Sequence, residues 1–324
     1  MFRSRSRRLG SAALAAFLAL GAATACDPPA PTPTFVVTTT ADGVDAAPGD
    51  GTCEMTPGAG DCSLRAAVDE GNALGTAAIT LPAGTYGGLG FQVTGNLSIN
   101  RDAPVDARLG SKWITVAAGG HLHVDGLSSY DVPGVRFTVE GTFVGRHLSL
   151  VGLESSSQVI VRPSGIAVVE NSLLAHVFGA TPSVRNEGVL ILQHTALLAW
   201  SAVGVPTTAF VNTGSAHVAA SVLQSCGGST APLSLGYNSD SDGTCALAAP
   251  GDQPAAPPLF AINLTQPVTY DLDATSPLVD AIPPGVNGCG TTVTDDLSGS
   301  PRPTDGNGDG TPGCDIGARE RPAP

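Results

Sequence analysis

Six glycines in the middle of the chain recur at nearly even intervals, and apolar residues keep fixed distances from them. Successive glycines are 25, 21, 24, 23 and 26 residues apart: Gly95, Gly120, Gly141, Gly165, Gly188 and Gly214. Two and four positions after them stand Leu97, Leu122, Phe143, Ala167, Leu190 and Ala216, then Ile99, Val124, Gly145, Val169, Leu192 and Val218. Four positions before them stand Phe91, Val116, Phe137, Val161, Val184 and Phe210, and nine after the last four stand Leu150, Leu174, Leu197 and Leu223.

This pattern has a physical explanation in a stack of short strands. Offsets of two place side chains on one face of a strand. Glycine permits a bend between two strands, or a positive φ. A period of 21–26 residues fits one coil of a solenoid, whose coils stack about 4.8 Å apart and bury a continuous core only together. A β-sandwich would explain alternation but not six equal offsets. The sequence therefore predicts an all-β, parallel β-helix, right-handed because parallel crossovers almost always are.

A polar column follows the second strand of each coil, where a tight corner is expected. It contains Asn100-Arg101, Asp125-Gly126, Arg146-His147, Glu170-Asn171, Gln193-His194 and Ala219-Ala220. Asn and Gly tolerate the left-handed conformation that such a corner needs. One interpretation is a solvated corner. The other is a ligand-facing stripe formed by Asp125, Arg146, Glu170 and Gln193.

The same column contains the best candidates for catalysis. Asp125 and Glu170 lie two coils apart, so their backbones should be about 9.6 Å apart. Hydrolytic carboxylate pairs in glycosidases lie roughly 5–9.5 Å apart. Arg146 between them would keep both ionised and leave no acid with a raised pKa. No catalytic residue is therefore assigned, and a carbohydrate-active β-helix enzyme acting outside the cell, a polysaccharide lyase or glycoside hydrolase, stays the alternative function.

The first 26 residues predict export. Four arginines precede an uncharged run rich in Ala and Leu, residues 9–25, which has the length of a signal-peptide core rather than a membrane span. We expect residues 1–25 to be a signal peptide. Cys26 then either follows an ordinary cleavage site or is the lipid-modified first residue of a lipoprotein, since Ala23-Thr24-Ala25-Cys26 resembles a bacterial lipobox. Residues 26–34 are rich in proline and predict an extended tether.

The number of cysteines favours the lipoprotein. Without Cys26, the mature chain keeps an even number, as expected in an oxidising compartment. They fall into three close pairs: Cys53/Cys62, Cys226/Cys245 and Cys289/Cys314. Six cysteines permit 15 connectivities, and neighbour pairing is preferred because each pair lies in a loop-rich segment.

The charge of the mature chain limits its partners. It carries 11 basic and 28 acidic residues, because the leader contains four arginines, so its net charge is −17. This charge argues against nucleic acid and against anionic lipid headgroups as partners.

Both open ends of a solenoid expose unpaired strands and need a cover. At the front, Ser63 can cap a short helix that presents Leu64, Ala67 and Val68 on one face and stops at Gly71-Asn72. A strand from Ile79 to Tyr86 then enters the first coil. At the back we expect a loop-rich cap that contains disulfides.

Here the chain resembles a known family, the bacterial parallel β-helix surface proteins with a CSLREA domain. The resemblance rests on Cys62-Ser63-Leu64-Arg65-Ala66-Ala67-Val68, with Ala66 where the family has Glu, and on the upstream Asp42, Asp45, Asp50 and Cys53. The C-terminal part is similar to the choice-of-anchor ending of the same proteins, except at Arg319. Its matching segments are Gly236-Tyr237-Asn238, Asp242-Gly243, Cys245, residues 276–281, Pro301-Arg302-Pro303 and residues 314–320. The resemblance divides the mature chain into a cap at 35–90, coils at 91–235 and a C-terminal segment at 236–324.

The resemblance implies a cell-surface or secreted β-helix of a kind often thought adhesive, and it transfers no catalytic residues to this chain. We expect a non-enzymatic binding scaffold, exported and held to a membrane by a lipid anchor or secreted. Its ligand would be a glycan or a cell-surface protein, not nucleic acid.

A cation site is a further expectation. Asp305, Asn307 and Asp309 alternate with glycines like the first half of a calcium-binding loop. Ile316 occupies the position of the closing Glu. The segment therefore predicts either a structural Ca²⁺ site or a Gly/Asp turn.

Overall fold

In the computed structural model, the chain is described at residues 31–102, 106–131, 134–152, 157–177, 181–200, 208–255, 259–263, 265 and 267–324. The predicted signal peptide and Cys26 lie outside these residues. Within the described part, no helix is long and apolar enough to cross a membrane.

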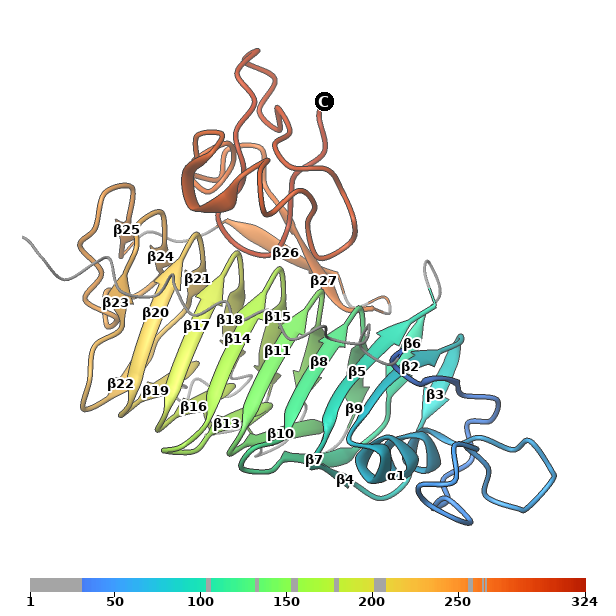
Figure 1. The fold of residues 1–324 in the computed structure, drawn as a ribbon. Coiled ribbons are helices and arrows are strands. Elements are labelled where there is room, and N and C mark those ends of the chain that lie inside the picture. The colour runs from blue at the N-terminus through green and yellow to red at the C-terminus, as the bar shows by residue number, and fades with distance from the viewer. Residues whose placement is uncertain are drawn as a thin grey trace, which may run out of the picture. The chain divides into compact units, whose positions relative to one another are not determined.

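The chain forms a right-handed parallel β-helix in which each coil adds one strand to each of three sheets, named A, B and C (Figure 1). Sheet A contains β1 (Thr34–Val36), β2 (Thr76–Leu81), β5 (Asn96–Arg101), β8 (His121–Asp125), β11 (Thr142–Arg146), β14 (Ile166–Glu170), β17 (Val189–Gln193), β20 (Ser215–Ala219) and β23 (Leu233–Ser234). Sheet B contains β3 (Gly84–Tyr86), β6 (Ala107–Leu109), β9 (Ser128–Asp131), β12 (Ser149–Gly152), β15 (Leu173–Val177), β18 (Ala196–Trp200), β21 (Val222–Leu223), β24 (Ser239–Asp240) and β25 (Gln253–Pro254). Sheet C contains β4 (Phe91–Val93), β7 (Lys112–Val116), β10 (Val135–Val139), β13 (Val159–Val161), β16 (Val184–Asn186), β19 (Phe210–Asn212) and β22 (Cys226–Gly228).

The apolar columns predicted from the glycine spacing form the interior. All of their members are buried, and Phe137, Phe143 and Phe210 are fully enclosed. In sheet A the register is the predicted one, since Leu97 pairs with Leu122 and Leu122 with Phe143. The parallel solenoid and its inward face are therefore confirmed.

In sheet C two members of the predicted column, Val116 and Val161, are wrong, because the residues that stack there are Ile114 and Val159, two positions earlier in the chain. Phe137 pairs with Ile114 and Val159, not with Val116 and Val161. The turns that leave β7 and β13 towards sheet A contain four residues, whereas those after β4, β10, β16 and β19 contain two. Counting back four residues from the glycine therefore stops two residues short of the stacked position, although a shift of two keeps the same face inward.

The repeated glycines are explained by close approach between coils, not by positive φ. None of the six has a positive φ. A Cβ on Gly141 would lie 2.3 Å from the carbonyl oxygen of Ala117, and one on Gly165 would lie 2.2 Å from that of Val139. Only glycine lets this turn stack on the preceding coil.

Helix α1 (Leu64–Leu74) covers the front end, as predicted. Ser63 caps it, and its side chain accepts a hydrogen bond from the amide of Ala66 at 3.0 Å. The helix does not stop at Gly71-Asn72 but continues to Gly75, which has φ 81°. Gly71 serves packing instead, because a Cβ there would lie 2.8 Å from side chains of Ala77 and Leu97.

Asn72 ties this helix to the first full coil. Its Oδ1 accepts from the amides of Thr94 and Gly95 at 2.8 and 3.1 Å, and its Nδ2 donates to the carbonyl of Gln92 at 2.7 Å. Thr34, expected in the tether, instead begins β1, which pairs with β2.

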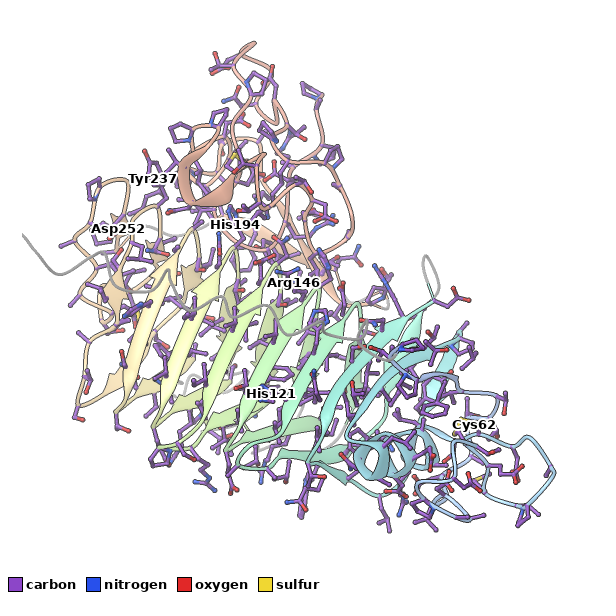
Figure 2. All side chains as sticks on the ribbon, viewed as in Figure 1. Cys62, His121, Arg146, His194, Tyr237 and Asp252 are labelled. Atoms are coloured by element: carbon purple, nitrogen blue, oxygen red, sulfur yellow. A yellow bond between two sulfur atoms is a disulfide. The ribbon has the colours of Figure 1, made fainter. Side chains whose placement is uncertain are left out.

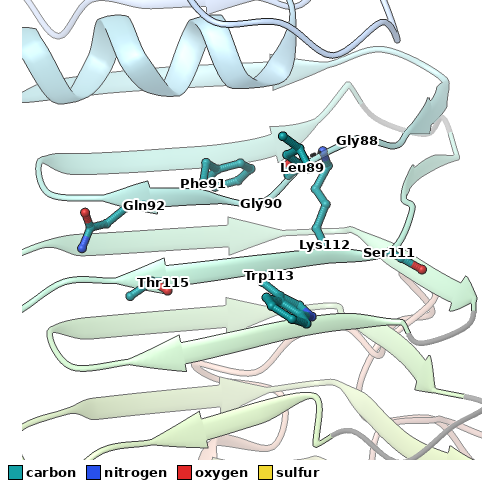
Figure 3. Close-up of a pocket in the computed structure, with 9 residues that line it drawn as sticks. All are labelled: Gly88, Leu89, Gly90, Phe91, Gln92, Ser111, Lys112, Trp113 and Thr115. Carbon is teal, nitrogen blue, oxygen red and sulfur yellow. Dashed lines mark hydrogen bonds between the residues drawn. The ribbon is translucent and has the colours of Figure 1, made fainter.

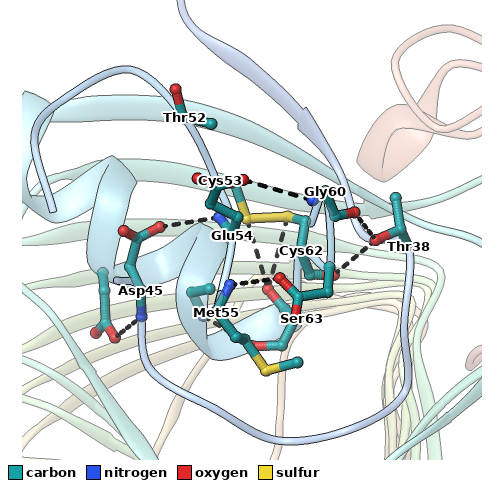
Figure 4. Close-up of a disulfide and its surroundings, with 12 residues drawn as sticks. Thr38, Asp45, Thr52, Cys53, Glu54, Met55, Gly60, Cys62 and Ser63 are labelled. Carbon is teal, nitrogen blue, oxygen red and sulfur yellow. Dashed lines mark hydrogen bonds between the residues drawn. A yellow bond between two sulfur atoms is a disulfide. The ribbon is translucent and has the colours of Figure 1, made fainter. Parts of the chain in front are cut away.

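The preferred neighbour pairing of the cysteines is confirmed by three disulfides: Cys53–Cys62, Cys226–Cys245 and Cys289–Cys314. Figure 4 shows the first, which holds the loop in front of α1. Beside it, Thr38 donates to the carbonyl of Gly60 at 2.8 Å. Such bonds fit an exported protein, because disulfides persist in oxidising compartments.

The C-terminal segment has two parts with different roles. Its beginning continues the solenoid through β24 and β25, and Cys245 and Leu247 close the end of the main core. From residue 259 onward the chain covers the outer face of sheet B with β26 (Phe260–Asn263), β27 (Thr269–Leu272) and a short 3-10 helix, η1 (Val286–Gly288). A second core forms there, in which Tyr270, Ile282 and Ile316 pack against Leu173, Leu198 and Val222.

Candidate functional site

The predicted polar column forms a continuous corner between sheets A and B, as its spacing predicts. Arg146 pairs with Asp125 in one neighbouring coil and with Glu170 in the other, and Glu170 pairs with Gln193. The following residue in successive coils has a positive φ: Gly126 75°, His147 48°, Asn171 46°, His194 46° and Ala220 53°. The left-handed corner is therefore confirmed from Gly126 onward, but not in the first coil, where Arg101 is the last residue of β5 and has no positive φ.

His147 connects this corner to the C-terminal segment. Its Nδ1 lies 2.7 Å from Asp125 Oδ1, and its Nε2 lies 3.2 Å from Asp295 Oδ1. Burial alone would lower the pKa of His147, but the two carboxylates outweigh it and raise that pKa above 6.5. Burial would raise the pKa of Asp125, but its bond to His147 holds it below 3.8.

The next two corners also receive the C-terminal segment. The side chain of Asn171 donates to the carbonyl of Asp295 at 2.8 Å, and that of Gln193 donates to the carbonyl of Asn287 at 2.8 Å. His194 Nε2 lies 3.2 Å from the same Asn287 oxygen. Burial lowers the pKa of His194 to about 3, so the ring is neutral and Nε2–H donates. Figure 2 shows Arg146 and His194 on the edge that faces this segment.

The acids of the corner do not form an open catalytic pair. Asp125 binds His147, and Glu170 Oε1 lies 3.5 Å from Arg146 Nε. Asp125 is thus held in its ionised form, whereas a general acid at neutral pH needs its proton held, and Glu170 is engaged with Arg146. Of the predicted ligand face, Gln193 binds the C-terminal segment and is no longer available to a ligand, whereas the Arg146 side chain stays 48% exposed.

The C-terminal motifs come together around one buried guanidinium. Arg302 donates to the carbonyls of Asp315 at 3.0 Å and Gly317 at 2.7 Å and forms an ion pair with Glu320. Both side chains of that pair are almost fully buried. The motif residues 301–303 and 314–320 thus have a structural role in holding this segment.

The predicted calcium loop is closed by its own backbone. Asp305 accepts hydrogen bonds from the amides of Gly308 at 2.8 Å and Gly310 at 2.9 Å. Asn307 accepts from the amide of Asp309 at 2.8 Å. Across the described residues, no three His, Cys, Asp or Glu side chains gather where they could hold a metal ion. The hydrogen bonds of this loop are those of a Gly/Asp turn, and they occupy the oxygens that a calcium ion would need.

A feature that the sequence interpretation missed lies on the outer face of sheet C. A groove of about 620 Å³ runs between the loop Gly88–Gly90 and β7 (Figure 3). Trp113 lies beside it with 65% of its surface exposed, and Leu89 is 70% exposed. A Cβ on Gly90 would lie 1.9 Å from the carbonyl oxygen of Trp113, so only glycine lets this loop cross so closely.

The alternation of β7 could have revealed this face. Ile114 and Val116 point inward, so Trp113 and Thr115 must point outward. Trp113 and Leu89 together expose apolar surface along one groove, and an exposed apolar patch often marks an interaction site.

Comparison with models of known protein families, with curated proteins and with solved structures finds no match. The β-helix itself is compatible with binding proteins and enzymes alike, so the function has to be argued from the site.

Proposed function

We propose that this protein is a non-catalytic binding scaffold of the cell exterior, attached to a membrane through a lipid on Cys26. The proposal keeps the resemblance to CSLREA-domain surface proteins. It is supported by the three disulfides, by the uncharged N-terminal run that ends at Cys26, and by the proline-rich residues before β1. Its ligand is a surface glycan.

One observation carries the proposal: the polar corner, the best candidate for catalysis, holds the protein's own C-terminal segment. Asp125, Asn171, Gln193 and His194 all make contacts that connect the corner to Asp295 or Asn287, directly or through His147. The outer face of sheet C carries an exposed aromatic side chain and a groove instead. Binding without bond cleavage is the activity that this arrangement supports.

The test uses the mature protein and a panel of polysaccharides and bacterial surfaces. We expect retention on at least one glycan and no release of reducing ends or unsaturated products over days. Degradation that disappears in the Asp125→Ala variant would replace the proposal by the enzyme alternative.

The anchor has its own test. Cells that express the full chain are labelled with a radioactive fatty-acid precursor, and the Cys26→Ser variant is the control. We expect label on the wild type and none on the variant, which should be released into the medium. Equal release of both proteins would remove the anchor and leave a secreted scaffold.

A further inference from the structure

The outer face of sheet C differs in charge from the rest of the chain. The whole protein has 28 acidic and 15 basic residues. The seven strands of sheet C contain three basic residues, Lys112, Arg136 and Arg185, and no acidic one. In a chain of this composition, an open face without acids is suited to an anionic ligand.

Two acids near this face have cationic partners. Asp42, behind the groove loop, forms an ion pair with Arg65 and lies 4.0 Å from Lys112. Lys112 also donates to the carbonyls of Gly87 and Leu89, so it holds the loop that walls the groove. At the far edge of sheet C, Glu187 lies 3.5 Å from Arg162. These contacts leave Arg136 and Arg185 as the outward cations of the sheet.

Trp113 and Arg136 form the centre of this face. They are paired residues on neighbouring coils, and the Arg136 guanidinium carbon lies 5.7 Å from the centre of the Trp113 ring. This contact orders both side chains before a ligand arrives. Arg136 Nε is buried and has no hydrogen-bond partner among the described residues. The planar fork of a guanidinium matches a carboxylate, which can accept two parallel hydrogen bonds from it.

We propose that this face binds a polysaccharide that carries carboxylate groups, with a sugar ring on Trp113 and a carboxylate on Arg136. The inference rests on the proposed function and adds the binding face and the ligand class. The aromatic surface supplies apolar contact to the sugar ring, and the groove has the volume of a small-ligand site. Gln92 and Thr115, paired on adjacent strands beside Trp113, supply polar groups for hydroxyls.

The ligand spans several coils. Arg185 is exposed on β16, three coils beyond Trp113, which corresponds to about 14 Å along the solenoid. A chain that lies along the axis reaches both arginines, whereas a monosaccharide reaches one. Affinity should therefore rise with oligomer length until both are engaged.

The experiment measures binding of polygalacturonate to the mature protein by calorimetry, with its fully methyl-esterified form as the matched ligand. The variants are Trp113→Ala, Arg136→Gln and, as a control with an exposed arginine elsewhere, Arg146→Gln. We expect each of the first two to weaken binding about tenfold or more. The control and the wild type should bind alike, and the methyl ester should bind at least about tenfold more weakly than the acid. Circular dichroism melting confirms that each variant is folded.

The outcomes separate the inference from the function on which it rests. Equal binding of the acid and the ester would contradict recognition of the carboxylate groups, but the proposed function as a glycan-binding scaffold would stand. If only Arg146→Gln loses binding, the ligand binds at the polar corner, and the proposal that the outer face of sheet C binds it is wrong. If the protein retains no polysaccharide and no cell surface, both the inference and the proposed function fail.

Discussion

His147 and Asp295 are 148 positions apart in the chain, yet Nε2 of the histidine lies 3.2 Å from Oδ1 of the aspartate. The first belongs to a corner of the solenoid and the second to the segment that covers sheet B. Because Asp125 lies on the other side of the ring, His147 is held between two carboxylates. Docking of the C-terminal segment should therefore depend on pH.

The direction of this pH dependence follows from the pKa shifts of His147 and Asp125. The pKa of His147 is raised above 6.5 in the folded protein, so its stabilisation is fully present below pH 6.5 and is lost as pH rises through the folded value. The pKa of Asp125 is lowered below 3.8, so its contribution is present above pH 3.8 and is lost as pH falls through the folded value. We expect the docking to be tightest between pH 3.8 and 6.5, as measured by proteolysis of the C-terminal segment.

His147→Asn is the matched variant, because Asn tolerates the left-handed φ at this position. It should remove the change that the wild type shows above pH 6.5 while the solenoid stays folded. A wild-type profile that is retained in the variant would assign the effect to another group.

Asn72 should be important for the front end of the solenoid. Asn72→Ala removes three hydrogen bonds to the first coil, two of them exposed to water, at a cost of about 1–2 kcal/mol. Asn72→Asp keeps the acceptor for Thr94 and Gly95 and should lose less. Urea unfolding measures both, and equal losses would contradict the assigned role.

Arg302 should stabilise the C-terminal segment rather than the coils. Arg302→Met leaves Glu320 buried without its cation, which costs about 3–5 kcal/mol. The double variant Arg302→Met, Glu320→Leu should recover much of this loss. Hydrogen exchange should rise in residues 267–324 and stay low in sheet A, whereas a uniform rise would show that the two cores unfold together.

The loop from Asp305 to Thr311 should be indifferent to calcium. Its side-chain oxygens accept hydrogen bonds from its own amides. We expect the same melting temperature in EDTA and in millimolar Ca²⁺, and a lower one in Asp305→Ala, which loses those bonds. A rise in melting temperature with Ca²⁺ that Asp309→Asn abolishes would restore the calcium site.

Sheet A could be predicted in register because it follows directly after the repeated glycines. The column in sheet C slipped because the turns before those glycines differ by two residues, and a shift of two leaves the apolar pattern intact. Pattern alone determines the face of a strand more firmly than its partner.

The sequence does indicate that the outer face of sheet B is covered, although the column of leucines describes only its inner face. Leu173-Leu174-Ala175 and Ala196-Leu197-Leu198 are continuous apolar runs, typical of strands that are buried on both faces. What covers them could not be predicted, because residues 259–324 lack a periodic pattern and reach the corner through backbone carbonyls such as that of Asn287.

The candidate site was only partly predictable. Spacing alone identified the corner that contains Asp125 and Glu170, but not the segment that docks on it. The exposure of Trp113 could be predicted from the alternation of apolar and other residues along its strand. Its pairing with Arg136 depends on the register of sheet C, the part that the glycine spacing misplaced.

The most direct test of the account is hydrogen exchange of the mature protein with and without saturating polygalacturonate. We predict added protection in β7, β10 and β16, with no change at Arg146-His147, Glu170-Asn171 and Gln193-His194. Added protection confined to those three corners would contradict the account, because it would place the ligand where the structure places the C-terminal segment.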